Sequence, residues 1–165
     1  MKAATRDDTK SALHRRIENV ADLAEEQSAG SAYVIYAILD PKRHDPLNRF
    51  TSLPIYIGVT SHMRRRVKQH FQRAAYNQFG TNRICAQLRK MLFANVVAEF
   101  EVIDRLDNKI DGMIAETVHA RELLRAGYKL CNWWYFQREI LTDEEIEAVM
   151  ARIRYAAGMA ERGWG

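Results

Sequence analysis

The chain has 165 residues, about the length of one domain, and 47% of its residues are hydrophobic and 28% charged. This composition is typical of a folded globular protein and excludes an intrinsically disordered chain. The 25 Lys and Arg residues against 21 Asp and Glu residues give a net charge of +4, which suits a nucleic-acid partner without requiring one.

Cysteine usage and the start of the chain bear on the compartment. Cys85 and Cys131 lie far apart and in no metal-binding spacing, which favours a reducing, cytoplasmic interior. The opening residues, MKAATRDDTKSALHRR, lack the apolar core of a signal peptide, and no later run approaches about 18 apolar residues. We therefore expect neither export nor a membrane-spanning segment.

The first predicted element is an amphipathic helix over residues 9–28. Its apolar side chains recur at helical spacing, and Gly30 marks its end. These side chains are Leu13, Ile17, Val20 and Leu23. We expect this helix to pack on the core of the protein or on a second copy of the chain.

Three segments rich in β-branched and aromatic residues predict strands, at 32–39, 55–59 and 98–106. A long polar loop over 40–54 separates the first two strands, which we expect to pair antiparallel. Further helices are expected at about 62–76, 82–93 and 109–126, and a capping box at Thr142 opens a last long helix. The predicted fold class is α+β, a small three-stranded antiparallel sheet flanked by helices.

Three regions are expected along the chain. Residues 1–30 form an N-terminal helical extension, and residues 31–136 form the main domain. Residues 137–165 form a C-terminal helix that packs on this domain or on a partner subunit.

The predicted helix after Ile57-Gly58 carries three consecutive arginines that differ in position. At 100° per residue, one arc about 80° wide is apolar and must be buried. It holds Met63, Val67, Phe71 and Ala74. Arg65 lies nearly opposite this arc and faces solvent, whereas Arg66 and His70 stack beside it. Arg66 is therefore the arginine that helix geometry places at the edge of the sheet.

The segment from Ser61 to Ala98 contains no Asp or Glu but many cations. We expect a positive surface that binds DNA phosphates. Its cations besides Arg66 are Arg64, Arg65, Lys68, Arg73, Arg83, Arg89 and Lys90. The alternative is a solvated helix face, or a patch neutralised by acids elsewhere in the fold.

Several polar landmarks follow one another over residues 32–132. Val34-Ile35-Tyr36 precedes Tyr56-Ile57-Gly58, and these are followed by four single polar residues: Arg66, His70, Glu116 and Asn132. This order and spacing resembles the GIY-YIG nuclease superfamily, and in particular its phage endonuclease II branch and single-domain, restriction-type members. Val34 replaces the usual first glycine, and the loop between the tyrosine motifs is longer than in compact members.

The resemblance implies a metal-dependent DNA endonuclease. Arg66 is expected to clamp a phosphate oxygen, because its fork geometry suits phosphate. Tyr36 is expected to be the general base, with His70 accepting its proton and Tyr56 positioning water or phosphate; the reverse assignment of the two tyrosines stays open. Arg66, His70 and a bound cation are expected to favour the phenolate.

Glu116 is expected to hold a divalent ion, Mg²⁺ with Mn²⁺ as a substitute. The buried side of its helix is expected at Ile110, Met113, Ile114, Thr117 and Leu124, with Glu116 on the shoulder. Gly58 and Asn132 are expected to support the site.

Other readings remain open. A catalytically inactive nucleic-acid-binding module on the same scaffold is the main alternative to a nuclease, and a regulatory protein that binds an acidic partner is another. Among nucleases, a prokaryotic restriction or phage enzyme fits the length best. The aromatic run 133–136 either stacks on bases or covers a core edge. A monomer, a homodimer and a higher homo-oligomer all stay open, as do the preferred strands and bases.

Overall fold

The computed structural model describes residues 6–76 and 82–132, together with a few separate positions after residue 143. The aromatic run 133–136 and most of the predicted C-terminal helix lie outside the described residues. The described elements are α1 (Arg6–Ser28), β1 (Tyr33–Asp40), β2 (Leu53–Thr60), α2 (Met63–Tyr76), α3 (Arg83–Phe93), β3 (Glu99–Leu106) and α4 (Lys109–Arg125). None of the helices in this part of the chain is long and apolar enough to cross a membrane.

The three strands form one antiparallel sheet in the order β2-β1-β3, which confirms the predicted α+β fold. The central strand β1 is buried along almost its whole length. This explains its continuous apolar sequence, because both of its faces need apolar partners. In the register, Tyr36 lies opposite Gly58 of β2 on one side and Val102 of β3 on the other.

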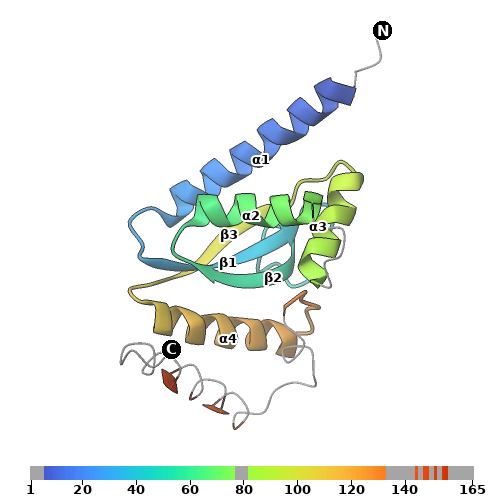
Figure 1. The fold of residues 1–165 in the computed structure, drawn as a ribbon. Coiled ribbons are helices and arrows are strands. Elements are labelled where there is room, and N and C mark those ends of the chain that lie inside the picture. The colour runs from blue at the N-terminus through green and yellow to red at the C-terminus, as the bar shows by residue number, and fades with distance from the viewer. Residues whose placement is uncertain are drawn as a thin grey trace.

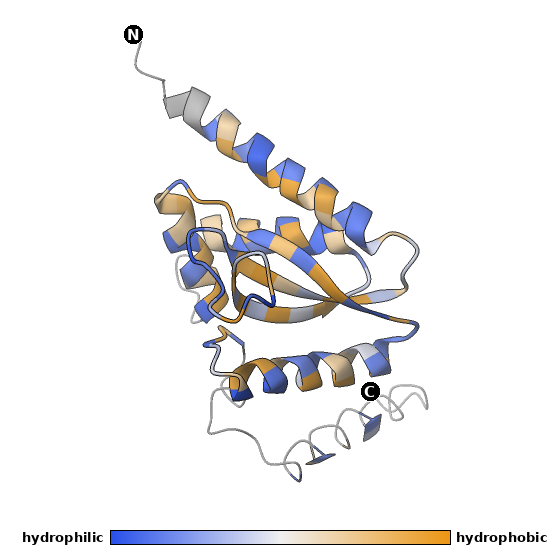
Figure 2. Ribbon diagram, turned by 180° about the vertical axis from the view of Figure 1, so that it is seen from behind, coloured by the Kyte–Doolittle hydropathy of each residue, from blue (hydrophilic) through white to orange (hydrophobic). Residues whose placement is uncertain are grey.

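Helices cover both faces of the sheet (Figure 1). α1, α2 and α3 lie over one face and α4 lies over the other. Alternate residues of β1 belong to two separate apolar clusters, because successive side chains of a strand point to opposite faces of the sheet. Val34, Tyr36 and Ile38 belong to the cluster on the α1–α3 side, whereas Ile35, Ala37 and Leu39 belong to the α4 side. Apolar colouring is accordingly dense along the strands between these layers (Figure 2).

α1 packs on the core of its own chain, the first of the two expected arrangements. Ala21 and Ala24 are fully buried against the cluster on the α1–α3 side. Leu23 was expected on the packed side but is 58% exposed. The small side chains of Ala21 and Ala24 allow close contact, and this contact turns Leu23 outward.

α4 is rotated relative to the expected orientation. Its buried residues are Gly112, Thr117, Ala120 and Leu123. A Cβ at Gly112 would come within 2.9 Å of the Val59 side chain, so glycine permits close contact between α4 and β2 at this point. Positions 112, 116, 120 and 123 share one face of a helix. Glu116 therefore lies on the same face of α4 as Gly112, Ala120 and Leu123, and its own side chain is partly buried.

One buried carboxylate organises the long loop between β1 and β2. Asp45 accepts hydrogen bonds from the backbone N–H groups of Leu47 (3.0 Å), Arg49 (2.8 Å) and Phe50 (2.9 Å) and from the Tyr128 hydroxyl (2.7 Å). Burial alone raises the pKa of Asp45, but these hydrogen bonds outweigh it and hold the pKa below its usual value. The loop is thereby tied to the segment that follows α4.

Candidate active site

The hydroxyl of Tyr36 joins β1 to α2. Arg66 Nε donates a hydrogen bond of 3.0 Å to the Tyr36 hydroxyl oxygen, and this hydroxyl lies 2.8 Å from His70 Nε2. An arginine only donates, so the Tyr36 hydroxyl accepts from Arg66 and is free to give its own hydrogen to His70. The helix spacing of Arg66 and His70, one turn apart, allows both to reach the same atom.

Gly58 makes room for this hydroxyl. It lies opposite Tyr36 in the β1–β2 pair. A Cβ at Gly58 would lie 2.5 Å from the Tyr36 hydroxyl oxygen and 2.8 Å from a ring carbon of Tyr56. Any larger residue would displace one of the two rings, so the motif glycine is required by close packing rather than by backbone conformation.

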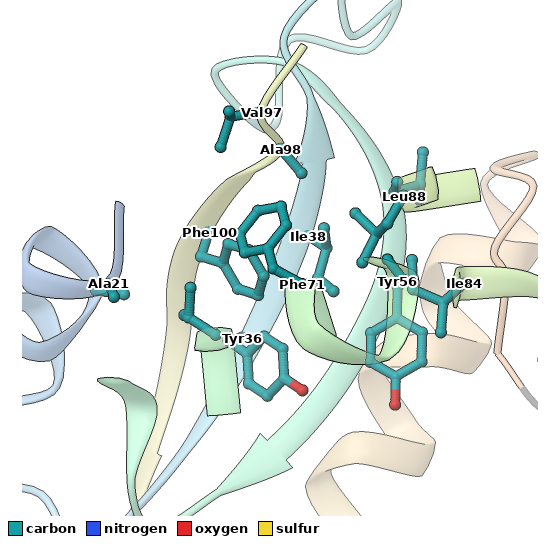
Figure 3. Close-up of a cluster of buried hydrophobic side chains, with 14 of the residues drawn as sticks. Ala21, Tyr36, Ile38, Tyr56, Phe71, Ile84, Leu88, Val97, Ala98 and Phe100 are labelled. Carbon is teal, nitrogen blue, oxygen red and sulfur yellow. The ribbon is translucent and has the colours of Figure 1, made fainter. Parts of the chain in front are cut away.

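The second tyrosine and Phe100 complete the cluster, and Figure 3 shows both with Tyr36 among the buried hydrophobic side chains. The ring centroids of Tyr36 and Tyr56 are 6.3 Å apart. Phe100 of β3 stacks against Tyr36 at 5.9 Å and contacts His70 at the same distance. Sequence reasoning did not identify Phe100 as a neighbour of the site. Phe100 is visible in the sequence as an aromatic residue of the third strand. Its proximity to Tyr36 follows only from the register between β3 and β1.

The ionisation of the phenols differs from the sequence-based expectation. Burial raises the pKa of Tyr36 and of Tyr56, and the charge of Arg66 opposes this only in part. Tyr36 is completely buried, whereas Tyr56 retains 8% exposure. Arg66 favours the Tyr36 phenolate, as expected, but the loss of hydration outweighs its charge, so the phenol keeps its proton in the free protein.

His70 is held neutral. Burial, followed by the charges of Arg66 and Arg73, lowers its pKa to about 3. A neutral imidazole keeps one ring nitrogen as an acceptor, which fits Nε2 facing the Tyr36 hydroxyl. His70 can therefore accept a hydrogen bond from Tyr36, but so low a pKa opposes the expected transfer of the Tyr36 proton to His70.

Glu116 lies on α4, which covers the face of the sheet opposite α2, and it is electrostatically coupled to the cluster. Its negative charge acts on both phenols, and the charge of Arg66 acts on Glu116 in turn. Burial raises the pKa of Glu116 to about 7, although Arg66 lowers it. At neutral pH this carboxyl is poised between its two forms, which is typical of functional sites.

Asn132 fastens the outer edge of β2. Its side chain accepts a hydrogen bond from the Ile57 N–H (3.0 Å) and donates one to the Ile57 carbonyl (2.7 Å). The adjacent Cys131 N–H donates to the Ile55 carbonyl (2.6 Å). These bonds satisfy the edge strand on both sides of Tyr56 and fix its position.

The expected basic surface divides into engaged and open cations. Arg64 pairs with Glu18 (2.7 Å) and Asp22 of α1, and Lys68 pairs with Glu18 (2.8 Å). Arg89 Nε donates to the carbonyl of Ala74 at the end of α2 (2.7 Å). The four remaining cations, Arg65, Arg73, Arg83 and Lys90, are exposed. Acids of α1 thus neutralise part of the patch, as the alternative allowed.

Comparison with known proteins identifies no relative: no family model, no curated protein and no solved structure matches this chain. The likeness to GIY-YIG nucleases therefore rests on the motif residues alone and stays a prediction.

Proposed function

We propose that the protein is a metal-dependent DNA endonuclease that hydrolyses phosphodiester bonds at the cluster of Tyr36, Tyr56, Arg66, His70 and Glu116. One observation carries the proposal. Residues from β1, β2, α2 and α4, up to 80 positions apart in the sequence, interact around a single half-buried guanidinium, that of Arg66. Such convergence of an arginine, hydroxyls, an imidazole and a carboxyl is the chemistry that a phosphate needs.

Each side chain has a role in this proposal. Arg66 binds a non-bridging phosphate oxygen, held in place by its bond to Tyr36. Tyr56 is the more exposed phenol. We therefore propose that Tyr56 contacts the attacking water, as expected from the sequence, and that the completely buried Tyr36 is not the general base. Tyr36 and His70 act as positioning residues for Arg66, because both are buried behind it.

A divalent cation fits at Glu116 only together with the substrate. Among the described residues there is no group of three or more His, Cys, Asp or Glu side chains that would hold a metal by themselves. Mg²⁺ is commonly held by one or two carboxylates with substrate phosphates and water. A bound cation would supply charge neutralisation at the phosphate, and Glu116 must give up its proton to accept it. Weak metal binding without DNA follows from this donor set.

The test is cleavage of circular duplex DNA and of single-stranded DNA by the purified protein, with Mg²⁺ or with EDTA. We expect Mg²⁺-dependent nicking or cutting, lost in Arg66→Ala and kept in Arg65→Ala. Arg65 is the matched control because it neighbours Arg66 but is exposed. Binding without cleavage in any condition would favour the inactive binding module. If the protein neither binds nor cleaves DNA, both nucleic-acid functions are excluded.

A further inference from the structure

A row of basic and aromatic side chains runs along α2 away from the candidate site. Arg66 and Arg73 are two turns apart and so lie nearly in line, and Tyr76 follows about 60° further around the helix. Arg66 is half-buried, whereas Arg73 is exposed and Tyr76 is 83% exposed. The row begins beside Tyr36 and ends with a tyrosine ring on the open surface.

No acidic side chain among the described residues forms an ion pair with the exposed cation of this row, Arg73. Arg73 follows His70 by three residues on α2, so it lies within one turn of the cluster, and its charge acts on His70 and Tyr56. Arg64 and Lys68, on the flank that faces α1, are in contrast paired with acids. The sequence from Ser61 to Ala98 also supplies no acid nearby. A negatively charged strand is the complementary occupant.

The exposed ring of Tyr76 favours a single strand over a duplex. Aromatic rings next to cations bind single-stranded nucleic acid, because the ring stacks on an unpaired base while the cations follow the phosphates. Bases inside a duplex are already stacked and are not available to such a ring. We infer that the row Arg66–Arg73–Tyr76 binds an unpaired DNA strand next to the scissile phosphate, with Tyr76 stacked on one of its bases. This inference rests on the proposed function for the position of the scissile phosphate.

Helix geometry gives the length of the contact. Ten residues separate Arg66 from Tyr76, which is about 15 Å along the helix axis. If the unpaired strand keeps the rise of a strand in B-DNA, about 3.4 Å per nucleotide, the stacked base lies about four nucleotides from the phosphate at Arg66, and a more extended strand needs fewer. The preferred substrate is therefore DNA with an unpaired stretch long enough to span this contact beside the cut.

The experiment measures binding in EDTA, so that it does not depend on cleavage. Oligonucleotides carrying one 2-aminopurine at successive positions are titrated with the full-length protein, as single strands and as duplexes. We expect tighter binding of the single strand and quenched fluorescence at one or two adjacent positions. Tyr76→Ala should remove the quenching and weaken single-strand binding about tenfold, the usual effect of one stacked base. Tyr76→Phe should keep both.

Phe93→Ala is the matched control. Phe93 is 85% exposed, like Tyr76, but ends α3 and has no place in the row. Equal effects of Tyr76→Ala and Phe93→Ala, duplex binding as tight as single-strand binding, or tighter binding of an RNA of the same sequence would each overturn the inference. Tyr76-dependent quenching in a protein that never cleaves DNA would uphold the strand contact and reject the hydrolysis. Cleavage without this quenching would uphold the hydrolysis and reject the strand contact.

Discussion

The hydroxyl of Tyr36 is a polar atom placed in the middle of an apolar core, and its two partners decide what that placement achieves. A buried hydroxyl without partners is destabilising, so the bonds to Arg66 and His70 are needed for stability as well as for orientation. The same bonds hold the guanidinium of Arg66 in one direction. At this scale, stability and positioning depend on one atom.

Gly58→Ala tests the space reserved for that atom. The added methyl would approach the Tyr36 hydroxyl oxygen to 2.5 Å and its Cζ atom to 2.6 Å, and neither buried ring can move away freely. We expect the free energy of unfolding to fall by about 1–3 kcal/mol, as in overpacked cores. Urea denaturation measures it. In a Tyr36→Leu background the methyl should cost less, because only the close contact with Tyr56 at 2.8 Å remains; an equal cost there would contradict this account of Gly58.

His70 and Glu116 make opposite contributions to the pH dependence of stability. The pKa of His70 is about 3 in the folded protein and 6.5 in the unfolded chain, so its contribution to the free energy of unfolding falls as pH decreases from 6.5 towards 3. Glu116 has a folded pKa of about 7 against 4.5, so its contribution is fully present below 4.5 and is lost as pH rises through 7. Between pH 4.5 and 6.5 the effects of His70 and Glu116 on the slope of stability against pH should nearly cancel.

Single variants separate these two contributions. Relative to the parent protein, His70→Gln should become less stable as pH rises from 3 to 6.5, and Glu116→Gln should become more stable as pH rises from 4.5 to 7. Chemical denaturation across this pH range measures both slopes. Parallel pH profiles for the parent and both variants would show that neither group changes its pKa on folding.

At the scale of elements, β2 depends on the segment that follows α4. Asn132 replaces a neighbouring strand at the outer edge by bonding both backbone groups of Ile57. Asn132→Ala should lower the free energy of unfolding by about 2–3 kcal/mol, because two hydrogen bonds are lost and a buried N–H is left unpaired. Hydrogen exchange should accelerate at the Ile57 amide more than in the β1–β3 pair.

Asn108→Ala provides the comparison for Asn132→Ala. The Asn108 side chain caps α4 by accepting from the Asp111 N–H (2.9 Å). Its loss should cost about 1 kcal/mol without selective exchange at Ile57. If Asn108→Ala accelerates exchange at Ile57 as much as Asn132→Ala does, the edge contact is not specific to Asn132.

The elements themselves were predictable because their sequence signals are local. β1 reads as an unbroken apolar run, and the buried arc expected on α2 is the observed one, with His70 added. The orientation of α4 was not predictable, since apolar residues occur on more than one of its sides and the intrahelical pattern is ambiguous. Only the contact of Gly112 with β2 fixes the rotation that brings Glu116 to the sheet.

The ion pairs between α1 and α2 were the other feature that could not be predicted from the sequence. Glu18 and Arg64 are 46 residues apart, and nothing local signals that α1 lies along α2. The motif spacing did identify the residues that meet at Tyr36. Their ionisation did not follow from spacing, because the burial that dominates each pKa is a property of the assembled core.

At the scale of the molecule, α1 limits how much of the positive charge on α2 is available. Glu18→Gln removes the partner of Lys68 and one of the partners of Arg64, which keeps its ion pair with Asp22. We expect tighter DNA binding at low salt, and a salt dependence steeper by about one phosphate contact. Glu26→Gln changes the net charge equally from an exposed site on the same helix. Equal gains for both variants would mean that only net charge matters.

The most direct test of the central claim separates binding from cleavage at the cluster. Single-turnover cleavage and DNA affinity are measured together, in Mg²⁺, for the parent protein, Glu116→Gln and Arg65→Ala. The account predicts that Glu116→Gln loses cleavage by at least about a hundredfold, the scale of removing one group that stabilises a transition state, while it retains most of the affinity. Arg65→Ala should still cleave. Cleavage by Glu116→Gln at the parent rate would contradict the account.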